Sequence, residues 1–279
     1  MQKILEAGKS RASWHEKGMI LKCPRRYALS LGAEKMPTAE TLQGSLMRQA
    51  LAHHYTTEEV ADPLTAVDIL AVQGLEQYPD LPWQEKADIV KQVYSEYKIH
   101  HWVADQSWKV EEVEYEMGYY VRDHDDTCYL HTQRADLIVK DIVSGLYYIV
   151  DHKTTGFIGP KLISNYSMGA QFVGYRNLGA FKYGEEFGGV IINLIEISQP
   201  KGQLKIKFKR QVVEAGIFAR DSFKHTVLHA NRTEKILTQI YGNPRENALA
   251  WPAVFSETEP CEGPYQRPCP YRELCMRGG

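Results

Sequence analysis

The chain contains two consecutive strand-like runs, Gln133-Arg-Ala-Asp136-Leu-Ile-Val139 and Leu146-Tyr-Tyr-Ile-Val-Asp151-His-Lys153, separated by a turn-like stretch at 141–145. An antiparallel hairpin centred near Val143 would place Asp136 opposite position 150 or 151, where side chains on one face have Cβ atoms roughly 5 Å apart. Lys153 would point to the same face as Asp151, because side chains alternate along a strand. Two carboxylates this close repel each other unless they share a proton or a cation. The hairpin therefore predicts a divalent-metal site with an amine beside it.

The alternative is a surface hairpin with an ordinary ion pair, since charged side chains are mostly exposed. The neighbouring residues favour the metal site. Ile149 and Val150 precede Asp151, and apolar residues 137–139 follow Asp136, a pattern typical of strands covered on both faces. Charges at the end of a covered strand need partners.

The composition is that of a globular protein with a substantial core, in one domain or two: of 279 residues, 43% are hydrophobic and 24% are charged. No apolar run approaches the length of a membrane span. The first residues, Met1-Gln-Lys-Ile-Leu-Glu6, lack the apolar stretch of a signal peptide. These features predict an intracellular protein without a membrane partner.

The formal net charge of −2 argues against a surface that is basic throughout, but a local basic patch can still bind nucleic acid. In the stretch 201–210, lysines alternate with apolar residues, so a strand here would have one basic face. This face has two interpretations. It is either an edge strand that lysines protect from aggregation, or a DNA contact that includes Lys205 and Lys207.

The order of the predicted elements indicates an α/β fold. Residues 1–104 read as mostly helical, with helices at 38–56, 63–78 and 83–102. The elements that follow are strands at 109–121, 127–140 and 146–151, a helix at 164–183, strands at 188–197 and 203–211, and a helix at 212–241. This order predicts a mixed central sheet flanked by helices. We expect three segments: a helical N-terminal region at 1–104, a core at 105–243 and a cysteine-rich tail at 244–279.

Three of the five cysteines lie in the last nineteen residues, at Cys261, Cys269 and Cys275. Clustered cysteines in an intracellular chain favour a metal site over disulfides. Cys23 is the leading fourth ligand, because proline follows it as it follows Cys269, and this ligand set would pack the tail on the N-terminal region. Cys128 falls within a predicted strand and is expected to be a buried apolar side chain. Four thiolates suit an iron–sulfur cluster or zinc, and irregular spacing without a Cys-x-x-Cys pair favours the cluster; unligated thiols are the third alternative.

Taken in order, these elements resemble the RecB-like branch of the PD-(D/E)XK nuclease superfamily, in particular its CRISPR-associated iron–sulfur exonucleases and the nuclease domain of AddB. Asp136 and the triplet 151–153 match the second and third motifs of the family, and Gln171-Phe-Val-Gly-Tyr175 matches its Gln-x-x-x-Tyr motif. One early and three late cysteines match the members that hold a cluster. The resemblance covers nearly the whole chain and implies a restriction-endonuclease-like α/β fold.

The first motif departs from the family pattern. It is usually Gly-x-x-x-His, whose histidine is a metal ligand, whereas Gly44-Ser-Leu-Met-Arg48 has arginine at that position. Arginine stays protonated and cannot ligate a cation. His53 and His54 follow, but His53 would point to a different face of the helix. Arg48 would contact a DNA phosphate instead, or the chain would be an altered variant.

The resemblance implies metal-dependent hydrolysis of DNA phosphodiester bonds. Asp136, Asp151 and the backbone carbonyl of His152 would hold Mg²⁺ or Mn²⁺, which polarises the phosphoryl oxygen and activates a water molecule. Lys153 would position that water or stabilise charge in the transition state. Gln171 would orient the nucleophile or Lys153, and Tyr175 would contact the strand backbone or pack on the sheet. Glu112 and Glu114, on the preceding strand, are candidates for an outer carboxylate.

The resemblance also implies a [4Fe-4S] cluster on Cys23, Cys261, Cys269 and Cys275, with Zn²⁺ as the alternative. The implied partners are single-stranded DNA or DNA ends and a helicase, a recombinase or a CRISPR adaptation protein, in the cytoplasm of a prokaryote or encoded by a virus. The alternative function is a DNA-binding or recombination-partner protein on a nuclease scaffold that Arg48 weakens. A third is an RNA-processing factor stabilised by zinc.

Overall fold

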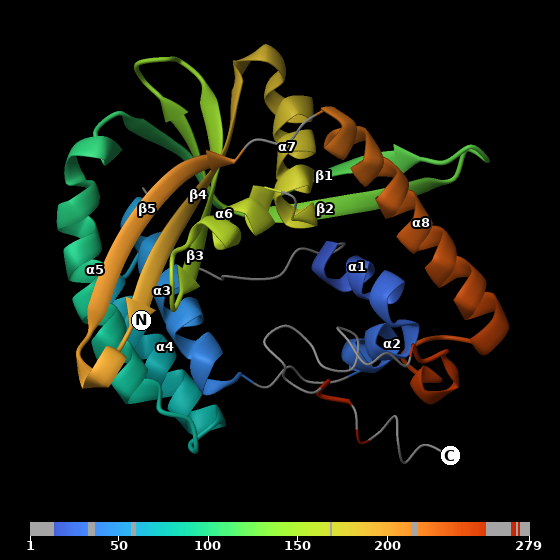
Figure 1. The fold of residues 1–279 in the computed structure, drawn as a ribbon, viewed down its shortest axis with the longest axis horizontal. Helices are drawn as coiled ribbons and strands as arrows, with labels where there is room; N and C mark the ends of the chain where they lie inside the picture. The colour runs from blue at the N-terminus through green and yellow to red at the C-terminus, as the bar shows by residue number, and fades with distance from the viewer. Residues whose placement is uncertain are drawn as a thin grey trace. The chain divides into compact units, whose positions relative to one another are not determined.

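The computed structural model describes residues 14–32, 37–56, 60–167, 169–213, 217–254, 269–271 and 273 (Figure 1). In these ranges the helices are α1 (Trp14–Lys22), α2 (Pro24–Gly32), α3 (Ala39–Tyr55), α4 (Pro63–Gln77), α5 (Trp83–Asp105), α6 (Pro160–Ser167), α7 (Ala170–Tyr183) and α8 (Ile217–Tyr241). The strands are β1 (Trp108–Arg122), β2 (Cys128–Asp141), β3 (Tyr147–Thr155), β4 (Phe187–Ser198) and β5 (Lys205–Val213). The predicted order of helices and strands is therefore confirmed, except that two helices, α6 and α7, stand where one was predicted.

The five strands form one mixed sheet in the order β1-β2-β3-β4-β5. β2 pairs antiparallel with β3, β3 pairs parallel with β4 through the crossover helices α6 and α7, and β4 pairs antiparallel with β5. β3 continues beyond the predicted end at Asp151, because its pairing with β4 runs on to Thr155 and Glu196. The prediction of a single helix at 164–183 is wrong: α6 and α7 are separate, and Gly169, in extended backbone, caps the start of α7.

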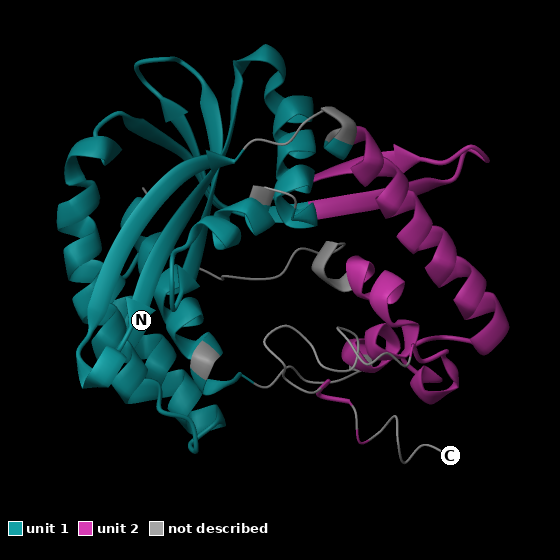
Figure 2. Cartoon of the chain, in the orientation of Figure 1, with its two compact units in different colours: residues 1–10, 37–117, 133–220 teal, residues 11–36, 118–132, 221–279 magenta. Residues whose placement is uncertain are grey.

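Two compact units alternate along the chain (Figure 2). The first comprises residues 1–10, 37–117 and 133–220, and the second comprises residues 11–36, 118–132 and 221–279. The predicted division at 104 and 243 stays a prediction. All the candidate residues described below for the hydrolytic site belong to the first unit.

The core of the first unit lies between α3–α5 and one face of the sheet. Leu46 of α3, Val90 of α5, and Leu137 and Val150 of the hairpin belong to it and are fully buried. Burying one such side chain contributes about 1.5–3 kcal/mol. α7 covers the opposite side of the strands with Phe172 and its neighbours (Figure 1). β3 is thus covered on both faces, as its apolar sequence predicted.

The second unit has its own smaller core, formed by Ile20, Tyr27, Ala28, Ala230 and Trp251. The rings of Tyr27 and Trp251 lie with their centroids 6.1 Å apart. This cluster joins α1 and α2 to α8 and to the segment that follows it. In the part of the chain that the structure describes, no helix is both long enough and apolar enough to cross a membrane.

The cysteines of the second unit differ in exposure. Cys23, between α1 and α2, and Cys269 are both buried, and neither forms a disulfide. Cys128 is exposed, so the prediction that it is buried is wrong. It is the first residue of β2, directly after the turn that joins β1 to β2, and its sulfur lies 3.7 Å from the carbonyl oxygen of Asp126 in that turn. A strand pattern alone does not show that this end of the strand is uncovered.

Candidate active site

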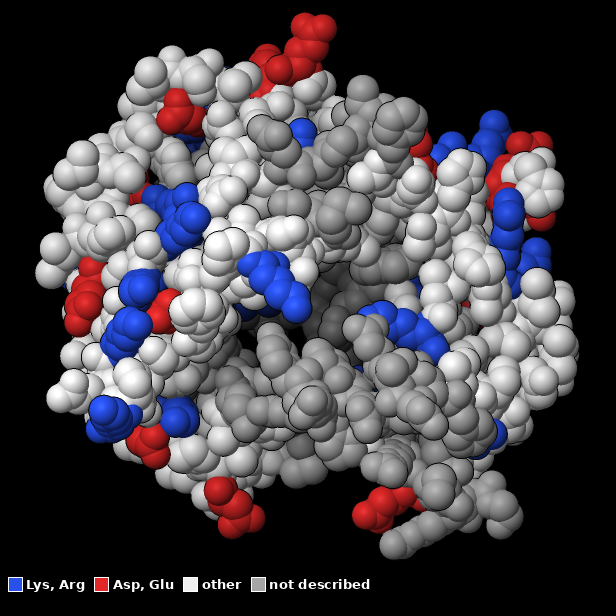
Figure 3. Space-filling view, in the orientation of Figure 1, with Lys and Arg blue, Asp and Glu red and all other residues white. Residues whose placement is uncertain are grey.

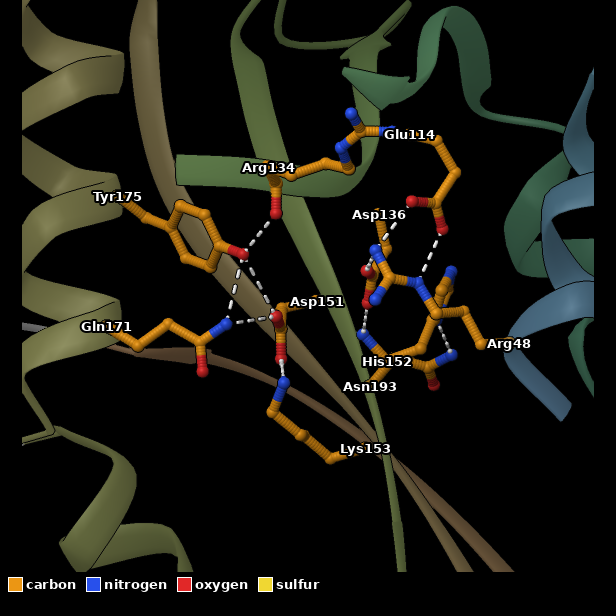
Figure 4. A network of polar contacts seen from close by, with 10 residues as sticks. All are labelled: Arg48, Glu114, Arg134, Asp136, Asp151, His152, Lys153, Gln171, Tyr175 and Asn193. Carbon is orange, nitrogen blue, oxygen red and sulfur yellow. Dashed lines mark hydrogen bonds and ion pairs between the residues drawn. The ribbon is translucent and has the colours of Figure 1, made fainter. Parts of the chain in front are cut away.

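The two aspartates meet where the β2–β3 ladder ends. Backbone pairing runs from Lys140 and Tyr147 to Leu137 and Val150, and one further step in this register sets position 136 against position 151, as predicted. There Oδ2 of Asp136 accepts a hydrogen bond of 2.8 Å from the backbone N–H of His152 (Figure 4). A buried amide needs an acceptor, and here a side chain supplies one in place of the neighbouring strand. β3 remains paired with β4, so the site lies at the open end of the hairpin.

Asp151 is buried, with 1% of its surface exposed, and both of its oxygens have partners. Oδ2 lies 2.6 Å from Nζ of Lys153. Oδ1 accepts a hydrogen bond of 3.0 Å from Nε2 of Gln171 and lies 3.2 Å from the hydroxyl of Tyr175. Gln171 and Tyr175 reach the same oxygen because residues four apart share a helix face. The structure thus brings four of the predicted residues together.

The contacts of Gln171 and Tyr175 are with groups of the protein itself. Gln171 contacts Asp151, not the amine of Lys153, and it also donates to the hydroxyl of Tyr175 at 3.1 Å. The hydroxyl of Tyr175 donates to the backbone carbonyl of Arg134 at 2.6 Å, and the side chain is 1% exposed. Both residues therefore hold the carboxylate of Asp151 on β3 in place, and Tyr175 also anchors α7 to β2.

Burial and neighbouring charges act against each other at Asp151 and Lys153, with a different outcome at each. Desolvation raises the pKa of Asp151 to about 6, with Asp136 adding to the rise and Lys153 opposing it. Burial by itself would lower the pKa of Lys153, but Asp151 and Asp136 outweigh it and raise that pKa. The amine is therefore protonated at neutral pH. A further positive charge close to Asp151 would therefore stabilise its ionised carboxylate.

Arg48 lies beside these acids, at the position where the family pattern has histidine. Its Nε and Nη2 donate to the two carboxylate oxygens of Glu114 at 2.6 and 2.5 Å, and Nη2 lies 3.0 Å from Oδ1 of Asp136 (Figure 4). Arg48 thus bridges acids of β1 and β2. His53 does not take its place, because it is buried with Nδ1 2.8 Å from the carbonyl oxygen of Ala61.

Glu114 had only a weak sequence signal, as one of two candidate outer carboxylates. Its side chain is 5% exposed, and desolvation raises its pKa to about 7 against the opposing effect of Arg48. Glu112 is exposed. The backbone of Glu114 has φ of 51°, in the left-handed region, within a long strand. The arginine in the first motif was a signal for a nearby anion, but nothing in the sequence favoured Glu114 over Glu112.

Gly44, the first residue of the same motif, lets α3 lie close to β3. A Cβ atom added at Gly44 would come within 3.1 Å of Oγ1 of Thr154. This separation is tighter than ordinary van der Waals contact, so a larger residue would require Thr154 or the helix to shift by a few tenths of an ångström. The glycine therefore helps set the distance between Arg48 and the acids on the sheet.

The side chain of His152, which the sequence did not single out, is half-buried and held by several contacts. Its Nδ1 lies 2.7 Å from the amide nitrogen of Asn193, which also donates to the hydroxyl of Tyr97 at 2.7 Å. The amide nitrogen can only donate, so Nδ1 accepts and the ring proton is on Nε2. Desolvation lowers the pKa of His152 to about 4, and its ring stacks on Tyr55 with the planes 7° apart. These contacts fix the backbone whose amide binds Asp136.

Arg210 of β5 supports that network from the other side. It pairs with Asp105 at the end of α5 and donates to the hydroxyls of Tyr55 and Tyr97 at 2.9 and 2.8 Å. Its guanidinium carbon lies 4.2 Å from the centre of the Trp108 ring, within the range of a cation–π contact. One arginine thus ties together α3, α5 and β5 around His152.

The donor set at the site fits a hard cation. The carboxylates of Asp136 and Asp151 and the backbone carbonyl of His152 are all oxygen donors. Within the described ranges, no three or more His, Cys, Asp or Glu side chains are grouped to hold a metal ion. Mg²⁺ commonly uses one or two carboxylates and takes its other ligands from water and substrate phosphate, so a pair of aspartates is the kind of donor set it uses.

Lys205 and Lys207, the predicted nucleic-acid contacts, are exposed on the edge strand β5. Exposed lysines alternate there with half-buried apolar residues, as the sequence predicted. In the space-filling view, basic side chains gather over the part of this face along which β5 runs, with acidic side chains between them (Figure 3). Nζ of Lys205 lies 3.7 Å from an oxygen of the buried Glu196. Both interpretations of the basic strand, edge protection and DNA contact, agree with this arrangement.

Of the four predicted cluster ligands, Cys261 and Cys275 lie outside the described residues.

Comparison with known families shows that the model of the PD-(D/E)XK nuclease superfamily matches residues 19–276. Comparison with curated proteins gives no match. Among solved structures, the crystal structure of SSO0001 is 16% identical, covers 69% of this chain and 84% of its own, and has a TM-score of 0.34.

Proposed function

Because the chain belongs to the PD-(D/E)XK nuclease superfamily, we propose that it is a metal-dependent deoxyribonuclease whose reaction takes place at Asp136, Asp151 and Lys153. Its fold is the restriction-endonuclease-like mixed sheet flanked by helices. The observation that carries the proposal is the buried carboxylate of Asp151, 2.6 Å from the amine of Lys153 and next to Asp136 at the open end of the hairpin. Burying a charge costs free energy even when it is paired, and a buried carboxyl with a perturbed pKa beside a charged partner is a candidate for a functional site.

The proposed mechanism assigns a separate task to each group. Asp136, Asp151 and the carbonyl of His152 would hold Mg²⁺ or Mn²⁺, which supplies Lewis-acid stabilisation of the phosphoryl group. The ammonium of Lys153 stabilises the negative charge that develops on the phosphoryl oxygens, or positions the attacking water. Gln171 and Tyr175 keep the carboxylate of Asp151 in one orientation.

The test is cleavage by the purified full chain. We expect end-labelled single- or double-stranded DNA to be degraded with Mg²⁺ or Mn²⁺, and the reaction to stop with EDTA. Labelled RNA of the same sequence is the control and should remain intact. Equal or faster cleavage of RNA would favour the RNA-processing alternative, and no cleavage of any substrate would contradict the proposal.

A pH dependence follows from the raised pKa of Asp151. Because a proton occupies this carboxyl below about pH 6, a cation must displace it there, and we expect the affinity for Mn²⁺ and the cleavage rate to fall as pH drops through about 6. The stability of the metal-free fold changes with pH in the opposite direction. A carboxyl whose folded pKa is raised stabilises the fold fully below its unfolded pKa of about 4 and loses that contribution as pH rises through about 6.

Calorimetric titration with Mn²⁺ at a series of pH values checks this expectation, with circular dichroism at each pH as the control for folding. An affinity that stays constant across this pH range in a folded protein would contradict it.

A second candidate function is DNA binding without turnover, and the contact of Arg48 with Asp136 favours it. In that case the unaltered chain would bind DNA but not cleave it, and Arg48→His would gain cleavage. Binding assays and cleavage assays on both proteins distinguish the two candidates. Cleavage by the unaltered chain excludes the second one.

The proposal extends to a [4Fe-4S] cluster on Cys23, Cys261, Cys269 and Cys275. Its support is that Cys23 and Cys269, far apart in sequence, are both buried in the second unit and free of disulfides. Protein purified without oxygen should be brown and contain iron, and Cys23→Ser should lose both properties. A colourless preparation with stoichiometric zinc would establish the zinc alternative instead.

The ordered motifs, with Gln171 and Tyr175 after the hairpin, also support placement in the RecB-like branch and digestion from DNA ends in the cytoplasm. A helicase, a recombinase or a CRISPR adaptation protein would then supply those ends. Comparing linear with covalently closed circular single-stranded DNA tests this part. Degradation of the circles would indicate an endonuclease.

A further inference from the structure

We propose that Arg48 is a built-in cation of the acidic site, so that the site takes one divalent cation, at Asp136 and Asp151, and none at Glu114. This inference rests on the proposed metal-dependent function and adds the number of cations and the residue that determines it.

The contacts of Arg48 are those that a bridging cation would make. It occupies both carboxylate oxygens of Glu114, at 2.6 and 2.5 Å, and one oxygen of Asp136, at 3.0 Å. A divalent cation between these two acids would need the same oxygens. Arginine keeps its charge at any pH that a folded protein tolerates, and its planar fork matches a carboxylate. The guanidinium therefore excludes a metal ion from this part of the site for as long as it stays there.

The backbone around the pair holds it in position. Glu114 adopts φ of 51° inside β1, a conformation that residues with a side chain rarely take and that persists only when the surroundings require it. Its carboxylate is 5% exposed, and the side chain of Arg48 is 34% exposed. On the helix side, the absence of a side chain at Gly44 lets α3 lie close to β3. A mobile surface arginine would need none of these features.

The balance of charge also favours a single divalent cation. Three carboxylates, of Glu114, Asp136 and Asp151, lie among three cations: Arg48, Lys153 and Arg134, whose charge also acts on Glu114. These charges balance when all six groups are ionised. One divalent cation together with one phosphodiester then adds a single positive charge, whereas a second divalent cation would leave the buried site strongly positive. A neutral residue in place of Arg48 would remove one positive charge and so make a second divalent cation less unfavourable.

The test is the number of Mn²⁺ ions bound per chain, measured by calorimetry and by electron paramagnetic resonance of unbound Mn²⁺. The unaltered chain should bind one. Arg48→Gln removes the charge and nearly keeps the size of the side chain, and it should bind a second ion. The double variant Arg48→Gln with Glu114→Gln removes the ligand of the second ion and should return to one.

Two matched control variants should each bind one Mn²⁺ ion per chain. Arg48→Lys keeps a positive charge at the position, and Arg176→Gln removes a partly buried arginine of the same unit that donates to the carbonyl of Val213, away from the acids. Thermal unfolding curves show whether each variant is folded. If Arg48→Gln melts early without metal, Mn²⁺ should raise its melting temperature more than it raises that of the unaltered chain.

Two Mn²⁺ ions in the unaltered chain would overturn the inference, and so would one ion in a folded Arg48→Gln variant. If that variant lost DNA affinity while still binding one ion, Arg48 would be a phosphate contact instead. Cleavage assays separate this inference from the proposed function. DNA cleavage with two bound ions would refute only the inference, and one bound ion without cleavage would refute only the function.

Discussion

Asp151→Asn is expected to lower the DNA cleavage rate on the order of a thousandfold or more while the protein stays folded. The amide has nearly the shape of the carboxylate, so the contacts of Gln171 and Tyr175 with Oδ1 can be kept in part. What is lost is the negative charge that the raised pKa shows to be held at a cost in the buried site. Without it, the cation loses a ligand and Lys153 loses the counterion 2.6 Å from its amine.

Single-turnover cleavage of labelled DNA with Mn²⁺ measures this effect, and Mn²⁺ titration shows whether binding is lost as well. Asp80→Asn, at an exposed aspartate of the same unit, is the matched control and should cleave at the rate of the unaltered chain. The Asp151 variant cleaving at that rate would remove this residue from the mechanism.

Arg210→Met is expected to lower the free energy of unfolding by about 3–5 kcal/mol, the range for breaking a buried ion pair. The side chains of Arg210 and Asp105 are 13% and 16% exposed, so water replaces little of the lost interaction. The hydroxyls of Tyr55 and Tyr97 also lose a donor. Cleavage should fall as well, because Asn193 and His152 are held by the same network.

Urea unfolding followed by circular dichroism measures the loss. Arg122→Met is the control, since Arg122 and Asp126 are 72% and 81% exposed and such a pair contributes about 0–1 kcal/mol. Combining Arg210→Met with Asp105→Leu should recover part of the stability, because no unpaired charge is left behind. An Arg210 variant as stable as the control would show that the network adds nothing to the fold.

The features that sequence alone predicted depend on neighbours along the chain. Side chains alternate along a strand, and a short turn sets the register of a hairpin, so the positions of Asp136, Asp151 and Lys153 followed from local pattern. The same holds for Gln171 and Tyr175, because their spacing places them on one face of a helix. The order of helices and strands likewise followed from the change of apolar period.

Only the tertiary structure showed that Arg48 binds Glu114 and Asp136, and that Arg210 holds the network around His152. It also showed that the helix expected at 164–183 is two helices, α6 and α7, and that Cys128 is exposed. Arg48 and Glu114 are 66 residues apart in sequence, and their contact depends on the approach of α3 to the sheet and on an unusual backbone angle in β1. Burial and contacts between distant segments arise from packing in three dimensions, and no periodic pattern along the chain encodes which charged side chains will meet.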